Sequence, residues 1–387
     1  MRPDFDFFTI FVQGLSSIEV AVAVIGFVSA AAFAGLWATK LGRIILPQPQ
    51  ESRVADFLPF NKLMADGITI RCYNGSFARV FKVEGVDLSF VTDEKSLSMM
   101  EARKSWIDSM SDLQVVCRVI TLRERISMEA DSGDFGNQLL EQISMTWRNN
   151  LDRVYSNGHY IVLSVADRPE ALKDLNYASQ ALLATLNDYG VKPMFETEDS
   201  AAADSPLAIF SKICSPLSKP MPKVRGAEGY QLNELLTADH IHFTDEKGLI
   251  KFFSGDKEMF AIVMGIRSSG DYMDEGMIAS LLSIDCELTM LHNVKPIFKP
   301  HARALLMQQQ RMAAVTSFSP DVINQYSEAL SAIEDSDADY QALTEYAMDI
   351  IIKGETMEEI EFGESEVQRI CRLFSGSGGL GGSGGFL

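Results

Sequence analysis

The sequence predicts an α+β protein, with an N-terminal transmembrane helix followed by mixed sheet-and-helix assembly domains. Three observations lead to this fold class. Residues 20–39 form an uncharged apolar run, which is long enough to span a bilayer. Further along, apolar and polar residues alternate between turn residues, as in strands. Between those segments, apolar residues recur every three or four positions, as in helices.

The apolar run Val20–Thr39 contains no charged residue. About 20 residues at a rise of roughly 1.5 Å each match a hydrocarbon core of about 30 Å. A signal peptide is one alternative, but its first residues should be basic, whereas Arg2 is followed by Asp4, Asp6 and Glu19. A buried core helix is the other alternative, and it would usually have a polar face.

Lys40 and Arg43 directly follow the run. This excess of positive charge predicts a single-pass protein whose C-terminal bulk is cytoplasmic. Gly26, Ala30 and Ala34 recur every four residues and form a possible face for packing against another transmembrane helix.

The rest of the chain divides where its composition changes. Pro47 and Pro49 end the membrane segment, and an acidic stretch of small residues near 196–205 precedes several prolines. The final glycines and serines cannot bury a core. The predicted parts are a membrane anchor (1–46), a first α+β unit (47–195), a linker or long loop (196–229), a second α+β unit with a helical C-terminal part (230–374) and a Gly/Ser linker (375–387).

In the first unit, two alternating segments flank Asn74-Gly75, which is a strong hairpin turn signal. We therefore expect a β-hairpin over 67–83. The remaining patterns predict helices over 95–110, 135–154 and 169–189, and strands over 113–122 and 160–165.

In the second unit, alternation and apolar spacing again give short elements. We expect a helix over 274–282 and helices over 300–315, 320–333 and 338–352. The predicted strands are 240–243, 249–253, 259–266 and 286–294.

The overall charge limits the possible partners. The chain has 34 Lys and Arg against 53 Asp and Glu, a net charge of −19. This charge repels phosphate backbones, so we expect no direct nucleic-acid partner. The five cysteines are far apart and mostly in apolar surroundings, as reduced core thiols are. They are Cys72, Cys117, Cys214, Cys286 and Cys371.

No catalytic signature occurs in the chain. The phosphate loop G-x-x-x-x-G-K-[ST] is missing from the sequence, and no G-x-S-x-G nucleophile elbow follows a predicted strand. We therefore predict no catalytic residue, no cofactor and no metal. The acids Glu358 and Glu359 are interpreted as solvated charges at a helix end, because acid/base catalysis would require a cleft.

His240 and His242 are the basis of an alternative. Two residues apart on a strand, they should point to the same face, as in some metal sites. Asp239 or Asp245 could supply a third ligand. This alternative is a membrane-bound, metal-dependent enzyme.

Several segments in order resemble one known family. They are Glu51–Phe60, the hairpin Asn74–Gly85, the helix 181–190 that ends in Tyr-Gly, Tyr230–Leu236 and the strand 260–266. Together they resemble the N-terminal region of the type IV secretion and conjugation ATPases, which include TrbE and CagE, over about residues 51–360.

The resemblance implies a docking and oligomerisation domain, with other inner-membrane secretion subunits, the membrane and further copies of itself as partners. In this family the motor domain follows this region, and it would make the full-length protein an ATPase that forms hexamers. Without a phosphate loop, this chain is expected not to be an enzyme. The expected location is the bacterial inner membrane.

Overall fold

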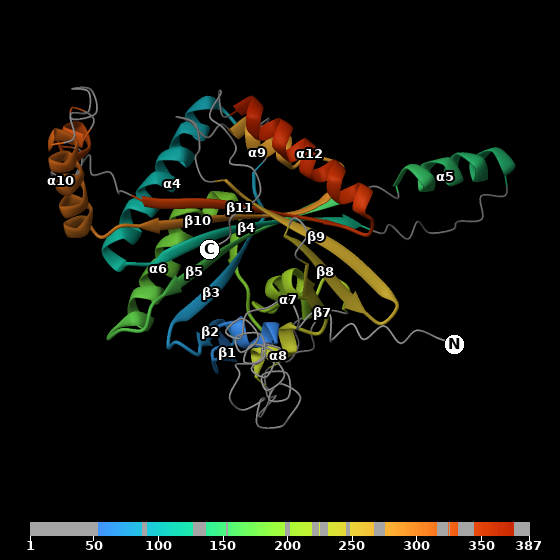
Figure 1. Cartoon of the computed structure of the whole chain (residues 1–387), viewed down its shortest axis with the longest axis horizontal. Coiled ribbons are helices and arrows are strands. Elements are labelled where there is room, and N and C mark those ends of the chain that lie inside the picture. The colour runs from blue at the N-terminus through green and yellow to red at the C-terminus, as the bar shows by residue number, and fades with distance from the viewer. Residues whose placement is uncertain are drawn as a thin grey trace, which may run out of the picture. The chain divides into compact units, whose positions relative to one another are not determined.

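The computed structural model describes the chain from Arg53 to Phe374 with several gaps (Figure 1). From Val54 onward, the described residues belong to one compact unit. The described residues are 53–86, 91–126, 137–151, 154–197, 202–218, 224, 231–244, 248–266, 275–315, 324, 326–331 and 344–374.

One large sheet forms the centre, and all pairings among its described strands are antiparallel. The strand order is β1-β2-β3-β5-β4-β10-β11-β9-β8-β7, and β6 also pairs with β3. The strands are β1 (Phe60–Leu63), β2 (Thr69–Cys72), β3 (Phe77–Val83), β4 (Val116–Ile126), β5 (Val154–Val165), β6 (Val191–Pro193), β7 (His240–Phe243), β8 (Leu249–Ser254), β9 (Lys257–Ile266), β10 (Glu287–Pro296) and β11 (Thr344–Gly354).

Helices cover both faces of the sheet. Helices α4 (Asp93–Leu113), α6 (Ala171–Thr185), α9 (Glu275–Leu281) and α12 (Met357–Phe374) lie on one face, and α7 (Ala208–Cys214) and α8 (Leu232–Leu236) lie against the other (Figure 1). Connections between long strands contain α5 (Gln138–Leu151) and α10 (Lys299–Val315). Short 3₁₀ turns occupy Val54–Phe57, Asn187–Tyr189 and Ala202–Asp204.

The two halves of the sheet repeat the same topology. The strand order is a palindrome about the β4–β10 pair, so β1, β2, β3, β4 and β5 correspond to β7, β8, β9, β10 and β11. Matching backbone hydrogen bonds support this correspondence: Met64 N donates to Thr69 O (2.8 Å) and Thr244 N to Leu249 O (2.9 Å). The first half, from β3 to β6, has the β-α-β-β-α-β order of a ferredoxin-like fold.

The halves join through seven paired residues of β4 and β10, from Cys117↔Val294 to Arg123↔Leu288. Rotating one half onto the other about the middle of this pairing places Ile120 on Leu291, with β4 and β10 running in the same direction. Val116 then corresponds to Glu287, and Gln114 to Asp285.

Alternation along the strands separates the hydrophobic cores. Cys117 and Leu163 face α4 and α6, whereas Ile120 and Val162 face the layer of α7 and α8. In the second half, Ile350 and Ile352 face α9 and α12. Helix α12 lies close to the sheet because it has glycine at 363, where a Cβ would come within 2.7 Å of Ile352 Cγ2.

The membrane part of the predicted fold class is corrected. Among the residues that the structure describes, no helix is long and apolar enough to cross a membrane. The longest of them, α4, contains acidic and basic residues along its length. The run 20–39 lies outside the described residues, as do Gly26, Ala30, Ala34, Lys40 and Arg43. The expected single-pass inner-membrane location is therefore not supported.

The predicted helix over 338–352 is wrong in its described part. Residues 344–354 form strand β11, which pairs with β10 and β9. Ile350, Ile351 and Ile352 are β-branched, which favours a strand. These isoleucines are apolar because β11 lies in the centre of the sheet, and a short apolar run does not distinguish a buried strand from a buried helix. Most other predicted elements are confirmed, including the hairpin of β2 and β3.

Candidate functional site

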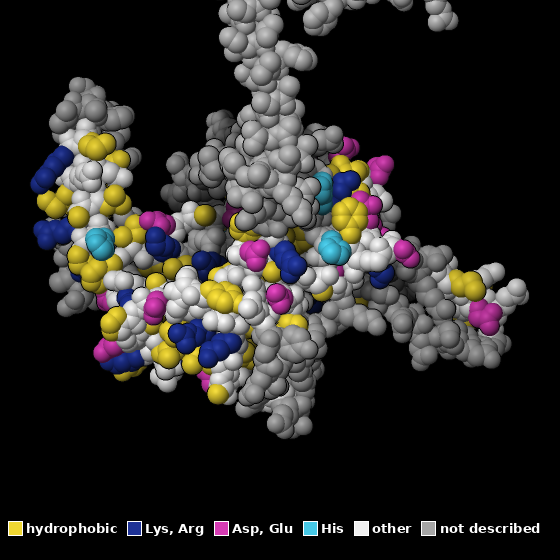
Figure 2. All heavy atoms as spheres, turned by 60° about the horizontal axis from the view of Figure 1, so that its bottom comes forward, with side chains coloured by type: hydrophobic (Ala, Val, Ile, Leu, Met, Phe, Trp, Pro, Cys, Tyr) yellow, Lys and Arg dark blue, Asp and Glu magenta, His cyan; other side chains and the backbone are white. Residues whose placement is uncertain are grey.

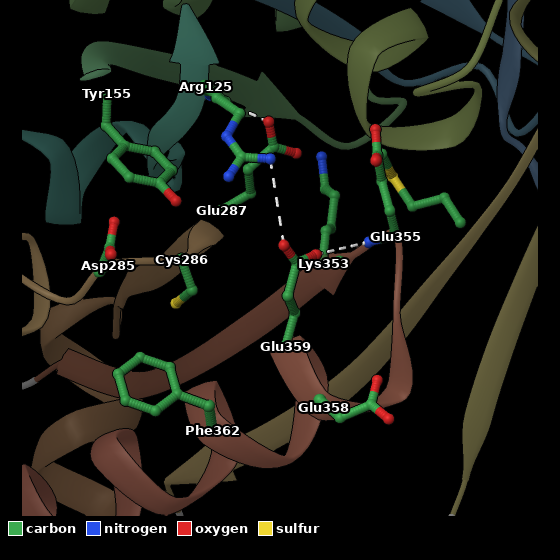
Figure 3. Close-up of a pocket in the computed structure, with 12 residues that line it drawn as sticks. Arg125, Tyr155, Asp285, Cys286, Glu287, Lys353, Glu355, Glu358, Glu359 and Phe362 are labelled. Atoms are coloured by element: carbon green, nitrogen blue, oxygen red, sulfur yellow. Dashed lines mark hydrogen bonds and ion pairs between the residues drawn. The ribbon is translucent and has the colours of Figure 1, made fainter. Parts of the chain in front are cut away.

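A pocket of about 290 Å³ opens where strands of both halves end (Figure 3). The end of β4 provides Arg125, and the start of β5 provides Tyr155. The start of β10, the end of β11 and the first turns of α12 supply most of the other lining residues. The lining residues are Arg125, Tyr155, Met259, Asp285, Cys286, Glu287, Lys353, Gly354, Glu355, Glu358, Glu359 and Phe362.

Acidic groups dominate the lining. It contains five carboxylates against Arg125 and Lys353. The Arg125 backbone N–H donates to Glu287 Oε1 at 2.9 Å, and the Arg125 guanidinium lies 4.0 Å from Glu359 Oε1. The two side chains of that ion pair are 35% and 42% exposed, so water screens the interaction. The pocket therefore retains a negative charge.

The start of α12 holds Glu359 at the pocket. Thr356 caps this helix, and its Oγ1 accepts from Glu359 N at 3.3 Å. In return, Glu359 Oε2 accepts from Glu355 N at 2.8 Å. This arrangement resembles a capping box, in which a threonine and a glutamate three residues later satisfy free N–H groups. Helix capping therefore fixes one carboxylate, whereas Glu355 and Glu358 are exposed.

Lys353 is the buried cation of the pocket, with 6% of its surface exposed. Burial lowers the pKa of Lys353, while the nearby Glu287 and Glu124 act in the opposite direction. Its Nζ lies 3.5 Å from the Lys212 carbonyl in the last turn of α7, where a helix favours positive charge. Lys353 thus connects the end of β11 to the helix on the other face.

The pocket has one aromatic wall on each side. Tyr155 lies beneath the Arg123 guanidinium, 4.4 Å from the ring centroid, and Arg123 Nε donates to Ile284 O at 3.0 Å. Burial, then the nearby Asp285, raises the pKa of Tyr155. Phe362 is 49% exposed and lies across the pocket from Tyr155 (Figure 3). These walls could contact the apolar part of a bound side chain.

Reactive groups in the pocket are not arranged for nucleophilic chemistry. Burial raises the pKa of the Cys286 thiol to about 12, so the nucleophilic thiolate is disfavoured at neutral pH. Its neighbours include the carboxylates of Asp285 and Glu287, which also disfavour a thiolate. The arrangement suits binding of a positively charged group better than catalysis.

The histidines proposed as metal ligands lie elsewhere. His240 and His242 are exposed on β7, opposite Phe253 and Lys251 of β8. Asp239 accepts hydrogen bonds from Leu217 N (2.8 Å) and Ser218 Oγ. In the described part of the chain, no group of three or more His, Cys, Asp or Glu is placed to hold a metal. Asp245, the other possible third ligand, lies outside the described residues.

The sequence pattern does not predict this pocket. Glu358 and Glu359 have the pattern of solvated helix-end charges, and Lys353 and Glu287 belong to no recognisable motif. One sequence signal was present: Thr356-Met-Glu-Glu359 has the spacing of a capping box. That signal would have located the start of α12, but it could not have identified the strands opposite.

The family comparison covers the second half of the sheet. Residues 202–378, a little less than half of the chain, match the CagE, TrbE, VirB family, component of type IV transporter system. This match includes the pocket residues from Met259 to Phe362, and it supports the resemblance over that part of the chain. Among curated proteins, none matches this chain.

Proposed function

We propose that this chain is an assembly domain of a type IV secretion ATPase, which docks on other secretion subunits and associates with further copies of itself. The match of residues 202–378 to a type IV transporter component carries the proposal. The sequence contains no phosphate loop, so its contribution is protein contact, not hydrolysis of ATP by this chain. The acidic pocket offers a binding surface for such contacts.

The proposal is tested in cells that carry the corresponding transfer system. Deletion of the coding sequence should abolish substrate transfer, and the full chain supplied in trans should restore it. A tagged full-length chain should recover other secretion subunits from cross-linked cells. Unimpaired transfer after deletion, without recovery of any secretion subunit, would contradict the proposal.

Enzymatic activity is tested separately. The purified full chain should hydrolyse ATP no faster than a buffer control with Mg²⁺ present, because no lysine-containing phosphate loop is available to stabilise the transferred phosphoryl group. Steady turnover that co-purifies with the chain through two chromatographic steps would contradict the assignment of a purely binding role.

A further inference from the structure

A basic arm projects from the second half of the sheet. Helix α10 follows β10 after two residues and contains Lys299, Arg303 and Arg311 but no acidic residue. The whole chain carries a net charge of −19, so the charge of this helix is opposite in sign to that of the molecule. Figure 2 shows Lys and Arg side chains among hydrophobic ones on this arm, at the left of the view.

One face of the arm is buried against a described segment of the chain, and another carries exposed side chains. Ala302 and Leu306 are buried against Tyr326, Ala329 and Leu330 of the segment 326–331, which contains one acid, Glu328.

On another side, Arg303, Met307 and Arg311 recur every four residues and are all exposed. Residues at this spacing share one helix face. Arg303 also interacts within the chain, so the exposed apolar contact and cation of this face that the contact uses are Met307 and Arg311.

The acidic pocket has the complementary properties. Five carboxylates surround its two cations, and the exposed ring of Phe362 offers an apolar contact. Its volume of about 290 Å³ is near the lower limit for small-molecule sites, which suits one or two long side chains. Glu355 and Glu358 stand exposed at this site.

The arm cannot reach the pocket of its own chain. Strand β10 begins at the pocket with Glu287 and ends at Pro296, two residues before α10. Ten residues at about 3.4 Å each separate the two sites by roughly 30 Å. Their complementary charges can therefore meet only between two molecules.

We propose that the α10 arm of one copy docks in the acidic pocket of the next copy, so that copies associate head to tail. This inference rests on the proposed function and names the surfaces for its self-association. Because the two surfaces differ, the contact is heterologous and generates a ring or an open filament, depending on whether the rotation closes. Attraction between the basic arm and the acidic pocket offsets the repulsion between two chains that each carry a net charge of −19.

Charge reversal tests the contact in the purified full chain. Arg311→Glu or Glu358→Lys should each weaken self-association about tenfold in sedimentation experiments at moderate salt, since like charges then face each other. Combining the two substitutions in one chain should restore association. Lys104→Glu and Glu101→Lys on the exposed side of α4 are matched controls with the same charge changes. Urea unfolding checks that every variant folds.

Cross-linking provides the second measurement. An equimolar mixture of Arg311→Cys and Glu358→Cys chains should form a disulfide between copies, and Lys104→Cys in place of Arg311→Cys should not. Unchanged association in both reversal variants, together with no cross-link, would overturn the inference. If Arg311→Glu instead abolished binding to phosphatidylglycerol vesicles while self-association stayed normal, the arm would bind a lipid surface and the inference would be wrong.

Transfer experiments separate the two proposals. A chain that is required for transfer, but whose reversal variants associate normally, leaves the proposed function intact and removes only the head-to-tail contact. A chain that is dispensable for transfer removes the proposed function, whatever the variants do.

Discussion

The two halves of the sheet have the same topology, but they differ at one equivalent place. In the first half it is where β4 begins beside the end of β5, and in the second half it is where β10 begins beside the end of β11; we call each place a corner. In the first half, Arg168 lies between β5 and α6 and donates to the Leu113 carbonyl, to Gln114 Oε1 (2.8 Å) and to Asp174 Oδ2 (2.8 Å). In the second half, the corresponding corner begins at Asp285, which is equivalent to Gln114, and there the acidic pocket opens. One arginine fills the first corner.

The two halves share the features that form the fold and differ in the residues that form the pocket. Strand order and core alternation are shared by the halves, so they specify the architecture and not the pocket. What differs is the chemistry at the strand ends. The equivalent of Val116 is Glu287, a carboxylate that accepts a hydrogen bond from the Arg125 N–H of the other half. A repeated fold can thus provide a structural corner in one half and a binding corner in the other.

The largest expected effect is in the filled corner. Arg168→Ala should lower the free energy of unfolding by about 2–4 kcal/mol, because it leaves Asp174 and the Leu113 carbonyl without their donor in a mostly buried place. Arg125→Ala in the open corner is the matched variant and should cost only about 0–1 kcal/mol. Urea unfolding of both variants measures the difference. Equal losses would mean that the two corners are structurally alike.

An intermediate effect is expected at Lys353. Lys353→Met should raise the free energy of unfolding at pH 7, because burial disfavours the charged form of Lys353 in the folded protein and methionine carries no charge. The lowered pKa means that the unfolded chain binds more protons than the folded one between that pKa and 10.5. Wild-type stability therefore gains from this group as pH rises.

The gap between Lys353→Met and wild type should accordingly shrink from pH 7 toward pH 10. The comparison of the two proteins at each pH cancels contributions from groups that they share, including the buried thiols of Cys117 and Cys286. A gap that stays constant with pH would show that Lys353 has an ordinary pKa in the folded protein.

The smallest effect concerns one histidine in each half. His159 Nδ1 lies 3.1 Å from Thr121 Oγ1, and His292 Nδ1 lies 2.7 Å from Tyr346 Oη. Burial lowers the pKa of both histidines. Their contribution to stability is complete above pH 6.5 and is lost as pH falls through the folded pKa.

His159→Gln and His292→Gln should therefore each reduce the loss of stability between pH 7 and pH 5. Denaturant midpoints at pH 5, 6 and 7 measure this change. If only one of the two variants alters the pH dependence, the central strands of the two halves differ in their electrostatic environment.

Much of the fold could be predicted locally. Asn74-Gly75 identified the hairpin of β2 and β3, and apolar spacing located α4 and α6. Prediction failed where burial hides periodicity. Strand β11 has mostly exposed residues in its first half and buried isoleucines in its second half, so its apolar spacing also fits a helix, and the helical interpretation was wrong. The start of helix α12 was not located within the predicted helical C-terminal part, even though Thr356 and Glu359 have the spacing of its cap.

By itself, the sequence determined the α+β composition, the strand and helix positions of most segments and the lack of a phosphate loop, because alternation, turn chemistry and fixed motifs are local properties. Only the tertiary structure decided that both halves share one sheet. The β4–β10 pairing brings Arg125 and Tyr155 to residues more than 100 positions later in the chain. The pocket depends on that non-local register, which no short pattern specifies.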